Sequence, residues 1–155
     1  MVDSAFSTEA FLQTSVEGSL DTKITPCPQG EFLAIAGKPE VRAAEIKRGD
    51  RAGEPIYFLD ITWDIQDDSI KEELGRDKVT VRQSLILDIK NDTLDMSKGK
   101  NIGLGRLREA LGQNTAGQPW SPAMLEGQLA KVVVSHRMDG DDVYAEIKQT
   151  RAPHG

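Results

Sequence analysis

Alternation between apolar and polar residues is the strongest pattern in this sequence, and it predicts a chain built mainly from β-strands. The clearest case is Pro55 to Ile65. Its apolar positions are Tyr57, Leu59, Ile61, Trp63 and Ile65. A period of two turns one face of a strand toward a core and leaves the other face to solvent. The stretch Lys78 to Ile89 has the same period, with mostly apolar odd positions, and predicts another strand of the same kind.

Three further strands are expected from shorter apolar runs. Glu31 to Lys47 reads as one long bent strand that is interrupted at Gly37-Lys38-Pro39, because proline has no N–H to donate to a ladder. Gln128 to Arg137 and Asp142 to Lys148 form a predicted hairpin, since Asp139-Gly140 between them is a strong turn signal.

One short helix is expected between the third and fourth of these strands. Asn101 is a suitable N-cap, Leu104 and Leu107 lie on one helical side, and Gly112 stands where a glycine ends a helix. The acidic stretch 67–77 is interpreted as a connector. The order of strands and helix predicts a single OB-like five-stranded barrel over residues 31–151.

Residues 1–30 show no sustained period, and they close with two prolines at 26 and 28. Proline favours extended backbone over helix. We therefore expect an N-terminal arm that docks on the barrel. Ser7 to Leu12 can form one helical turn capped by Ser7, with Phe11 and Leu12 pinning it to the barrel.

Charge and composition restrict the class of protein. The chain of 155 residues has a formal net charge of −6, which counts against nucleic-acid binding, yet the charges are unevenly spread. The run 98–108 holds four basic residues and no acidic one. No apolar stretch reaches the roughly 20 residues of a membrane span. Because Cys27 is the only cysteine and no charged-then-apolar leader is visible, we expect a cytoplasmic protein without disulfides.

Residues that would support catalysis or a cofactor are sparse. The two histidines and one cysteine do not make a zinc cluster, and the glycines at 99–105 lack the spacing of a phosphate-binding loop. We therefore expect neither enzyme activity nor a cofactor. A weaker alternative is a divalent-dependent nuclease that uses the acidic pairs Asp67-Asp68 and Asp141-Asp142.

Single-stranded DNA requires cations for its phosphates and flat rings on which bases stack. If the apolar side of the second and third strands faces inward, several cations and rings face outward. The candidate binding residues are Arg42, Lys47, Phe58, Lys78, Arg82, Lys131, Arg137 and Tyr144. The sequence thus predicts sequence-tolerant binding, with the lysines and arginines on phosphates and the two rings on bases.

Each candidate also has a structural interpretation. Phe58 can equally cap a second small core beneath the arm. Arg82 and Lys78 can form cross-strand ion pairs with acidic residues of the preceding strand. Asp60 and Asp64 are the acidic residues available for this. These interpretations favour an alternative function, a protein-interaction module that binds an enzyme without nucleic acid.

The sequence resembles a family of phage-encoded early proteins of the single-stranded DNA-binding type. The resembling stretches are 11–18, 30–32, 59–63, 80–83, 94–101, 104–112 and the final hairpin 131–148. The resemblance implies an OB-like fold and a role in phage DNA replication or recombination, in the cytoplasm of an infected bacterial host. Phage or host replication proteins are then possible partners, and exposed sheet edges make a homodimer plausible.

Overall fold

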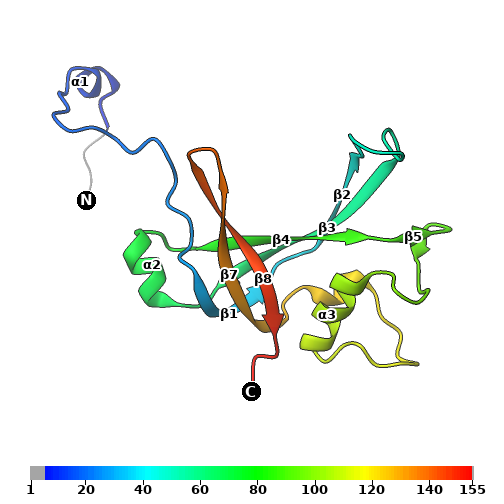
Figure 1. The fold of residues 1–155 in the computed structure, drawn as a ribbon. Coiled ribbons are helices and arrows are strands. Elements are labelled where there is room, and N and C mark those ends of the chain that lie inside the picture. The colour runs from blue at the N-terminus through cyan, green and yellow to red at the C-terminus, as the bar shows by residue number, and fades with distance from the viewer. Residues whose placement is uncertain (1–5, 155) are drawn as a thin grey trace.

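The computed structural model describes residues 6–154, and its chain is mainly β-structure (Figure 1). The elements in chain order are α1 (Thr8–Leu12), β1 (Gly30–Ala36), β2 (Glu40–Glu45), β3 (Pro55–Ile65), α2 (Asp68–Leu74), β4 (Thr80–Leu87), β5 (Ile89–Lys90), β6 (Thr93–Leu94), α3 (Ile102–Ala110), a 3-10 helix (Pro122–Leu125), β7 (Leu129–Asp139) and β8 (Asp142–Arg151). The predicted helix is therefore present as α3, and Leu104 and Leu107 on it are buried.

All strand pairs of the main sheet are antiparallel, and the strands follow the order β2-β3-β1-β7-β8, with β4 on β3. β4 pairs along β3 from Tyr57 to Asp64, so β1 and β2 share the opposite edge of β3. The predicted bent strand is thus confirmed as two halves, separated at residues 37–39. Gly37 fits this bend because its N–H donates to the Thr62 carbonyl at 2.8 Å, and a Cβ at this position would stand only 3.1 Å from the same oxygen.

The sheet is curved but not closed. β2, β4 and β8 are its outer strands, and some Cα atoms of β4 and β8 approach within 8 Å of each other. No ladder joins them in the part of the chain that the structure describes. The structure therefore confirms a mainly β fold with an antiparallel sheet. The closed five-stranded barrel is not seen.

The core lies on the apolar side of β3, as the alternation predicted. Leu59, Ile61, Trp63 and Ile65 are each at most 1% exposed. The indole N–H of Trp63 donates to the Gln83 side-chain oxygen at 2.8 Å, so its one polar group is satisfied. Valines and alanines of β1, β4 and β7 together with leucines of α3 complete the same core.

The interpretation of the stretch 67–77 as a connector is corrected by the structure, because this stretch contains the helix α2. The Asp67 side chain caps α2 by accepting from the backbone N–H groups of Ser69 and Ile70. Gly75 ends the helix in the left-handed conformation. Both are common helix-terminating devices.

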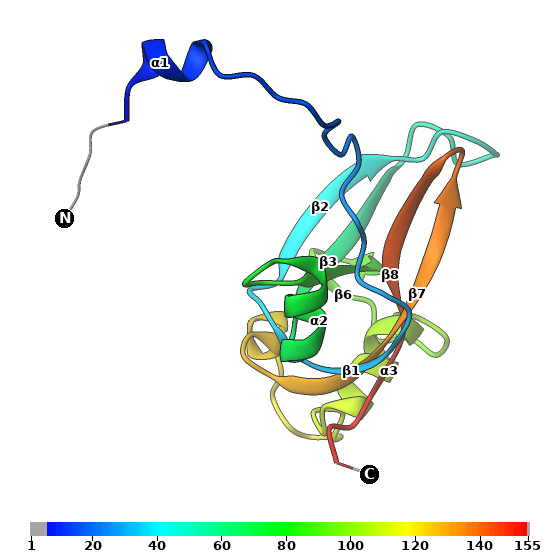
Figure 2. The same ribbon diagram turned by 90° about the vertical axis from the view of Figure 1, so that its left-hand side faces the viewer.

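The N-terminal arm differs most from expectation. Ser7 caps α1 as predicted, but α1 stands away from the sheet (Figure 2). Phe11 and Leu12 are 58% and 75% exposed, so the prediction that they pin the helix to the body is wrong. Contact with the body begins at Lys23, which binds the carbonyl oxygen of Asp141 and the carboxylate of Asp142. Residues 1–5 lie outside the described part of the chain.

Candidate nucleic-acid interface

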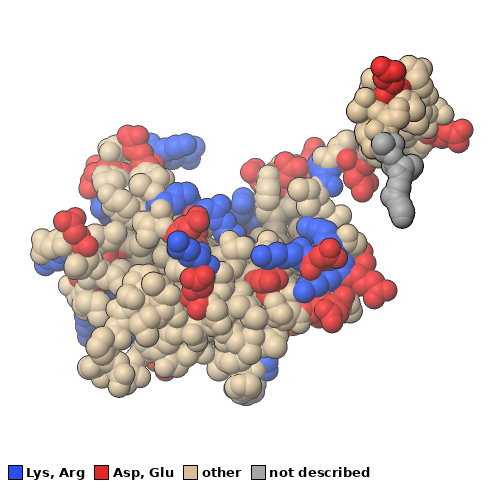
Figure 3. All heavy atoms as spheres, turned by 180° about the vertical axis from the view of Figure 1, so that it is seen from behind, with Lys and Arg blue, Asp and Glu red and all other residues tan. Residues whose placement is uncertain are grey.

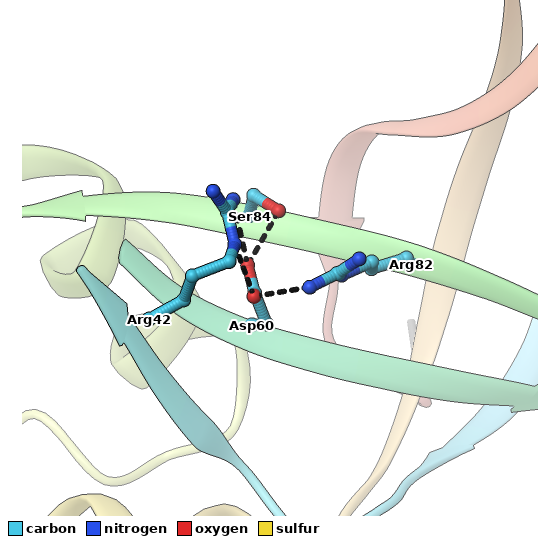
Figure 4. Close-up of polar contacts among 4 residues, drawn as sticks. All are labelled: Arg42, Asp60, Arg82 and Ser84. Carbon is cyan, nitrogen blue, oxygen red and sulfur yellow. Dashed lines mark hydrogen bonds and ion pairs between the residues drawn. The ribbon is translucent and has the colours of Figure 1, made fainter. Parts of the chain in front are cut away.

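Asp60 of β3 is the centre of a polar cluster on the outward face of the sheet (Figure 4). Arg42 of β2 donates through Nε to its Oδ2 at 2.9 Å and through Nη2 to Oδ1 at 3.4 Å. Arg82 of β4 donates to Oδ2, and Ser84 donates to Oδ1 at 2.6 Å. Asp60 is only 5% exposed, so two arginines and a hydroxyl satisfy a nearly buried carboxylate.

Strand register explains why both arginines reach the same carboxylate. Arg42 lies opposite Phe58 and Arg82 lies opposite Thr62. Each is therefore a diagonal neighbour of Asp60, two positions along β3, on the same face of the sheet. Diagonal neighbours in antiparallel strands are within reach of long side chains. The cross-strand interpretation of Arg82 thus holds for Asp60.

The groups around Asp60 lower the pKa of its carboxyl group. Burial opposes ionisation of the carboxyl group, but hydrogen bonds from Arg42, Ser84 and Arg82 outweigh it and lower the pKa to about 2. Asp60 is consequently charged at neutral pH, and one carboxylate offsets half of the positive charge of the two arginines.

The surroundings of Phe58 match neither of its two predicted roles fully, which were base stacking and the capping of a small core beneath the arm. It is half-buried, and the guanidinium carbon of Arg42 stands 4.4 Å from its ring centroid. This distance is within the range of a cation–π contact. The ring is therefore neither enclosed in a core nor fully open to solvent, and it sits beside Arg42 on the outward face.

A second group of candidate residues lies on the β7–β8 hairpin. Arg137 and Tyr144 are opposite each other in the ladder, and the guanidinium carbon is 5.0 Å from the tyrosine ring centroid. Arg137 also pairs with Glu146 at 3.4 Å. Tyr144 remains 44% exposed, so this hairpin presents an accessible ring next to a cation.

A groove joins the two groups where the sheet stays open. It has a volume of about 1140 Å³ and lies between β4, β8 and α3. We call it the β4–β8 groove. Its lining residues are 82–85, 103, 106, 109–110, 137 and 144–152. Arg82 from the first group and Arg137 with Tyr144 from the second therefore line one surface.

The remaining three candidates are not part of these groups. Lys47 is exposed in the β2–β3 connection, and Lys78 is exposed just before β4. Lys131 lies on β7 opposite Leu33 and Arg151. None of the three is among the described residues that line the groove. Sequence reasoning had placed them with the others because strand parity alone does not give position along the sheet.

Three cations of the groove were missed as site residues. They are Arg106 of α3 and Lys148 and Arg151 of β8. The available signal for Arg106 was the basic run 98–108. Its neighbour Arg108 does have a structural role, since it stacks 4.3 Å from the Trp120 ring centroid and donates to the Gln113 carbonyl oxygen.

Basic and acidic side chains lie close to one another on the face opposite that of Figure 1 (Figure 3). Lysine and arginine side chains form a band across the middle of this face, with acidic side chains between them and a denser acidic group at one side (Figure 3). Over residues 6–154, no group of three or more histidine, cysteine or acidic side chains is arranged to hold a metal ion. Within the same residues, no helix has both the length and the apolar character needed to cross a membrane.

No family model matches the chain, and no curated protein matches it in sequence. What can be inferred about function therefore comes from the arrangement of the side chains.

Proposed function

We propose that this protein binds single-stranded DNA across the outward face of β2, β3 and β4 and into the β4–β8 groove. The observation that carries the proposal is that Arg42, Phe58 and Arg82 share one face around Asp60. A fixed pair of guanidinium groups beside a ring is what a phosphate backbone with stacking bases requires. Following the resemblance to phage proteins, we assign this binding to phage DNA replication or recombination in an infected bacterial cell.

The strand connections support an OB-like barrel that is left open at one seam. With β1 and β2 taken as one bent strand, the described part of the chain contains five principal strands, and α3 stands between the third and the fourth. OB domains bind oligonucleotides mainly over their second and third strands. Here these are β3 and β4, which carry Phe58 and Arg82.

Asp60 contributes to such a site by holding the arginines in place. Each guanidinium group has five N–H donors, and Asp60 takes two from Arg42 and one from Arg82. The donors that remain are available for phosphate oxygens, and less side-chain entropy is lost when they bind. The cluster as a whole keeps one net positive charge.

Tyr144 supplies the accessible ring and the β4–β8 groove supplies further cations. A base stacked on an aromatic side chain contributes roughly 1–3 kcal/mol. Arg106 and Lys148 line the same groove as Tyr144. A strand that crosses Phe58 and Arg82 can thus continue past Tyr144 into a positively charged channel.

A protein-interaction module is the second candidate, and one observation favours it. Asp60 already neutralises part of the charge of Arg42 and Arg82, and Arg42 lies against the Phe58 ring. A cluster that satisfies itself in this way is also what a structural ion-pair network looks like. In that case the exposed surface would bind a phage or host protein and not DNA.

Fluorescence anisotropy of a labelled oligothymidine, titrated at two salt concentrations, tests the proposal. We expect Tyr144→Ala to weaken binding roughly 5- to 150-fold. Arg82→Ala should weaken all sequences alike and reduce the salt slope by about 1. Arg51→Ala is the matched control, because Arg51 is a 72% exposed arginine paired with Glu54 in the β2–β3 connection.

Unchanged anisotropy at micromolar protein would reject DNA binding. If binding occurs but Arg51→Ala weakens it as much as Arg82→Ala does, the site is not where we place it.

A further inference from the structure

The free part of the N-terminal arm exposes an apolar stripe that its own chain does not cover. Leu12, Val16 and Leu20 are between 73% and 82% exposed and recur at every fourth position. Residues four apart share a face both in a strand and in a helix. The arm therefore has one apolar side in either conformation. Exposed apolar surface of this kind marks sites of protein contact.

The β4–β8 groove has the complementary properties. Leu85, Ala145 and Ile147 give it apolar side chains. It is bordered by the outer strands β4 and β8, whose outward edges carry backbone groups that no ladder in the described chain uses. Such edges accept an additional strand, and pockets beside them accept its alternate side chains.

Charge complementarity favours the N-terminal arm as the segment that occupies the β4–β8 groove. Residues 6–22 contain three acidic residues and no lysine or arginine. Five basic and two acidic side chains line the groove. The basic residues are Arg82, Arg106, Arg137, Lys148 and Arg151, and the acidic ones are Glu109 and Glu146. An acidic segment with an apolar side thus fits a cationic groove with an apolar lining.

The direction in which the arm leaves the body favours docking in the groove of a second copy of the chain over docking in its own groove. Thr22 to Cys27 lie against the first residues of β4 and β8, in a cleft of about 710 Å³ that shares Arg82, Tyr144 and Ala145 with the β4–β8 groove. From Lys23 the arm runs away from the body, and α3, which borders the groove, lies on the other side of the molecule (Figure 1). To enter its own groove the arm would have to reverse at this anchor.

We propose that the N-terminal arm of one copy docks in the β4–β8 groove of a second copy, with its apolar side on Ile147 and its carboxylates beside Arg106 and Lys148. The arm and the groove are different surfaces, so the contact joins unlike faces of the two copies and can extend to further copies or close into a ring. The inference does not depend on DNA binding.

Analytical ultracentrifugation over a range of protein concentrations, without DNA, tests it. The wild-type mass should rise above the 17.0 kDa of one chain. The arm variant V16S/L20S and the groove variant Lys148→Glu should each remain at that mass, with dissociation constants raised at least about tenfold. The control Met96→Ser removes a 79% exposed apolar side chain outside the arm and should associate like the wild type.

Mixing the two defective variants gives the decisive result. The arm variant keeps an intact groove, and Lys148→Glu keeps an intact arm, so together they should form a one-to-one pair at twice the mass of one chain. A wild type that stays monomeric at every concentration would overturn the proposal, as would association that persists in V16S/L20S or a mixture that does not pair. The arm variant should bind a short oligothymidine at least as tightly as the wild type, because no arm competes for the groove, so failure of DNA binding and failure of arm docking are distinguishable.

Discussion

Replacement of Asp60 by asparagine is expected to lower the free energy of unfolding at neutral pH by about 2–3 kcal/mol. The structure sets this magnitude through the pKa of Asp60, which is about 2 in the folded chain. An aspartate in an unfolded chain has a pKa of roughly 3.9, and each pH unit of difference is worth about 1.4 kcal/mol. Arg42 and Arg82 are 44% and 58% exposed, so both regain water when the carboxylate is removed.

The sign of the pH dependence follows from the lowered pKa. Because the folded carboxyl group binds its proton less readily, the unfolded chain takes up more protons between about pH 4 and pH 2. The stabilisation by Asp60 is therefore complete above about pH 4 and is lost as the pH falls toward 2. Asparagine cannot titrate, so the stability difference between wild type and variant should shrink over the same interval.

Urea unfolding at a series of pH values measures this difference. Tryptophan fluorescence is a suitable signal because Trp63 is completely buried. Ser84→Ala serves as a comparison, since it removes one hydrogen bond to the same carboxylate and keeps the charge. A difference between wild type and Asp60→Asn that stays constant from pH 7 to pH 3, or that is below about 0.5 kcal/mol at pH 7, would refute the role assigned to the two arginines.

Three further substitutions or reactions check other parts of the fold. Gln83→Leu should destabilise by roughly 1–3 kcal/mol in urea, because it leaves the buried indole N–H of Trp63 without an acceptor, whereas Gln83→Glu should retain most of the stability. Gly37→Ala should destabilise by roughly 1–3 kcal/mol, since the added carbon would stand 3.1 Å from the Thr62 carbonyl oxygen; melting temperature by circular dichroism measures it. Burial raises the pKa of the Cys27 thiol to about 11, so its alkylation at pH 8 should be on the order of 100-fold slower than in urea, as followed by mass spectrometry; equal rates would contradict the burial.

The strands could be predicted wherever one face alone is buried. β3 has the bounds that its alternation indicated, and the β7–β8 hairpin turns at the predicted Asp-Gly signal. The strand that follows α2 is shorter than expected, because residues 78 and 79 precede its ladder and β5 begins a separate two-stranded sheet at Ile89. Period-two patterns thus located strands well and their ends less well.

α2 was missed because its sequence is short and mostly charged. Only Ile70 and Leu74 provide the four-residue spacing of an apolar helical side, and both are half-buried. The capping pair of Asp67 and Gly75 was the available signal, and the high acidic content hid it. The prediction for the arm was wrong for a related reason. An apolar residue such as Phe11 indicates that some surface packs on it, but the sequence does not say which surface that is.

The candidate site was predictable in its residue types and not in its geometry. Strand parity placed Arg42, Phe58 and Arg82 on one face, and the structure brings these three together. Their common partner Asp60 depends on diagonal register across two ladders, which the sequence does not specify. The β4–β8 groove was even harder to predict from the sequence, because it lies where no ladder joins the two strands.

The net charge of −6 does not by itself oppose DNA binding, because charges act over short distances in salt. At physiological ionic strength, screening limits the interaction of exposed charges to about 8 Å. Five cations and two carboxylates line the β4–β8 groove, and Asp60 and Glu31 pair with two of these cations from outside it, so the cations still outnumber the carboxylates. The acidic excess lies in the free arm and in the stretch 67–77. A phosphate in the groove therefore experiences the local positive charge. Steep weakening of binding by added salt and a negative net charge are thus compatible in this molecule, and the arm's carboxylates are drawn to the same cations for the same reason.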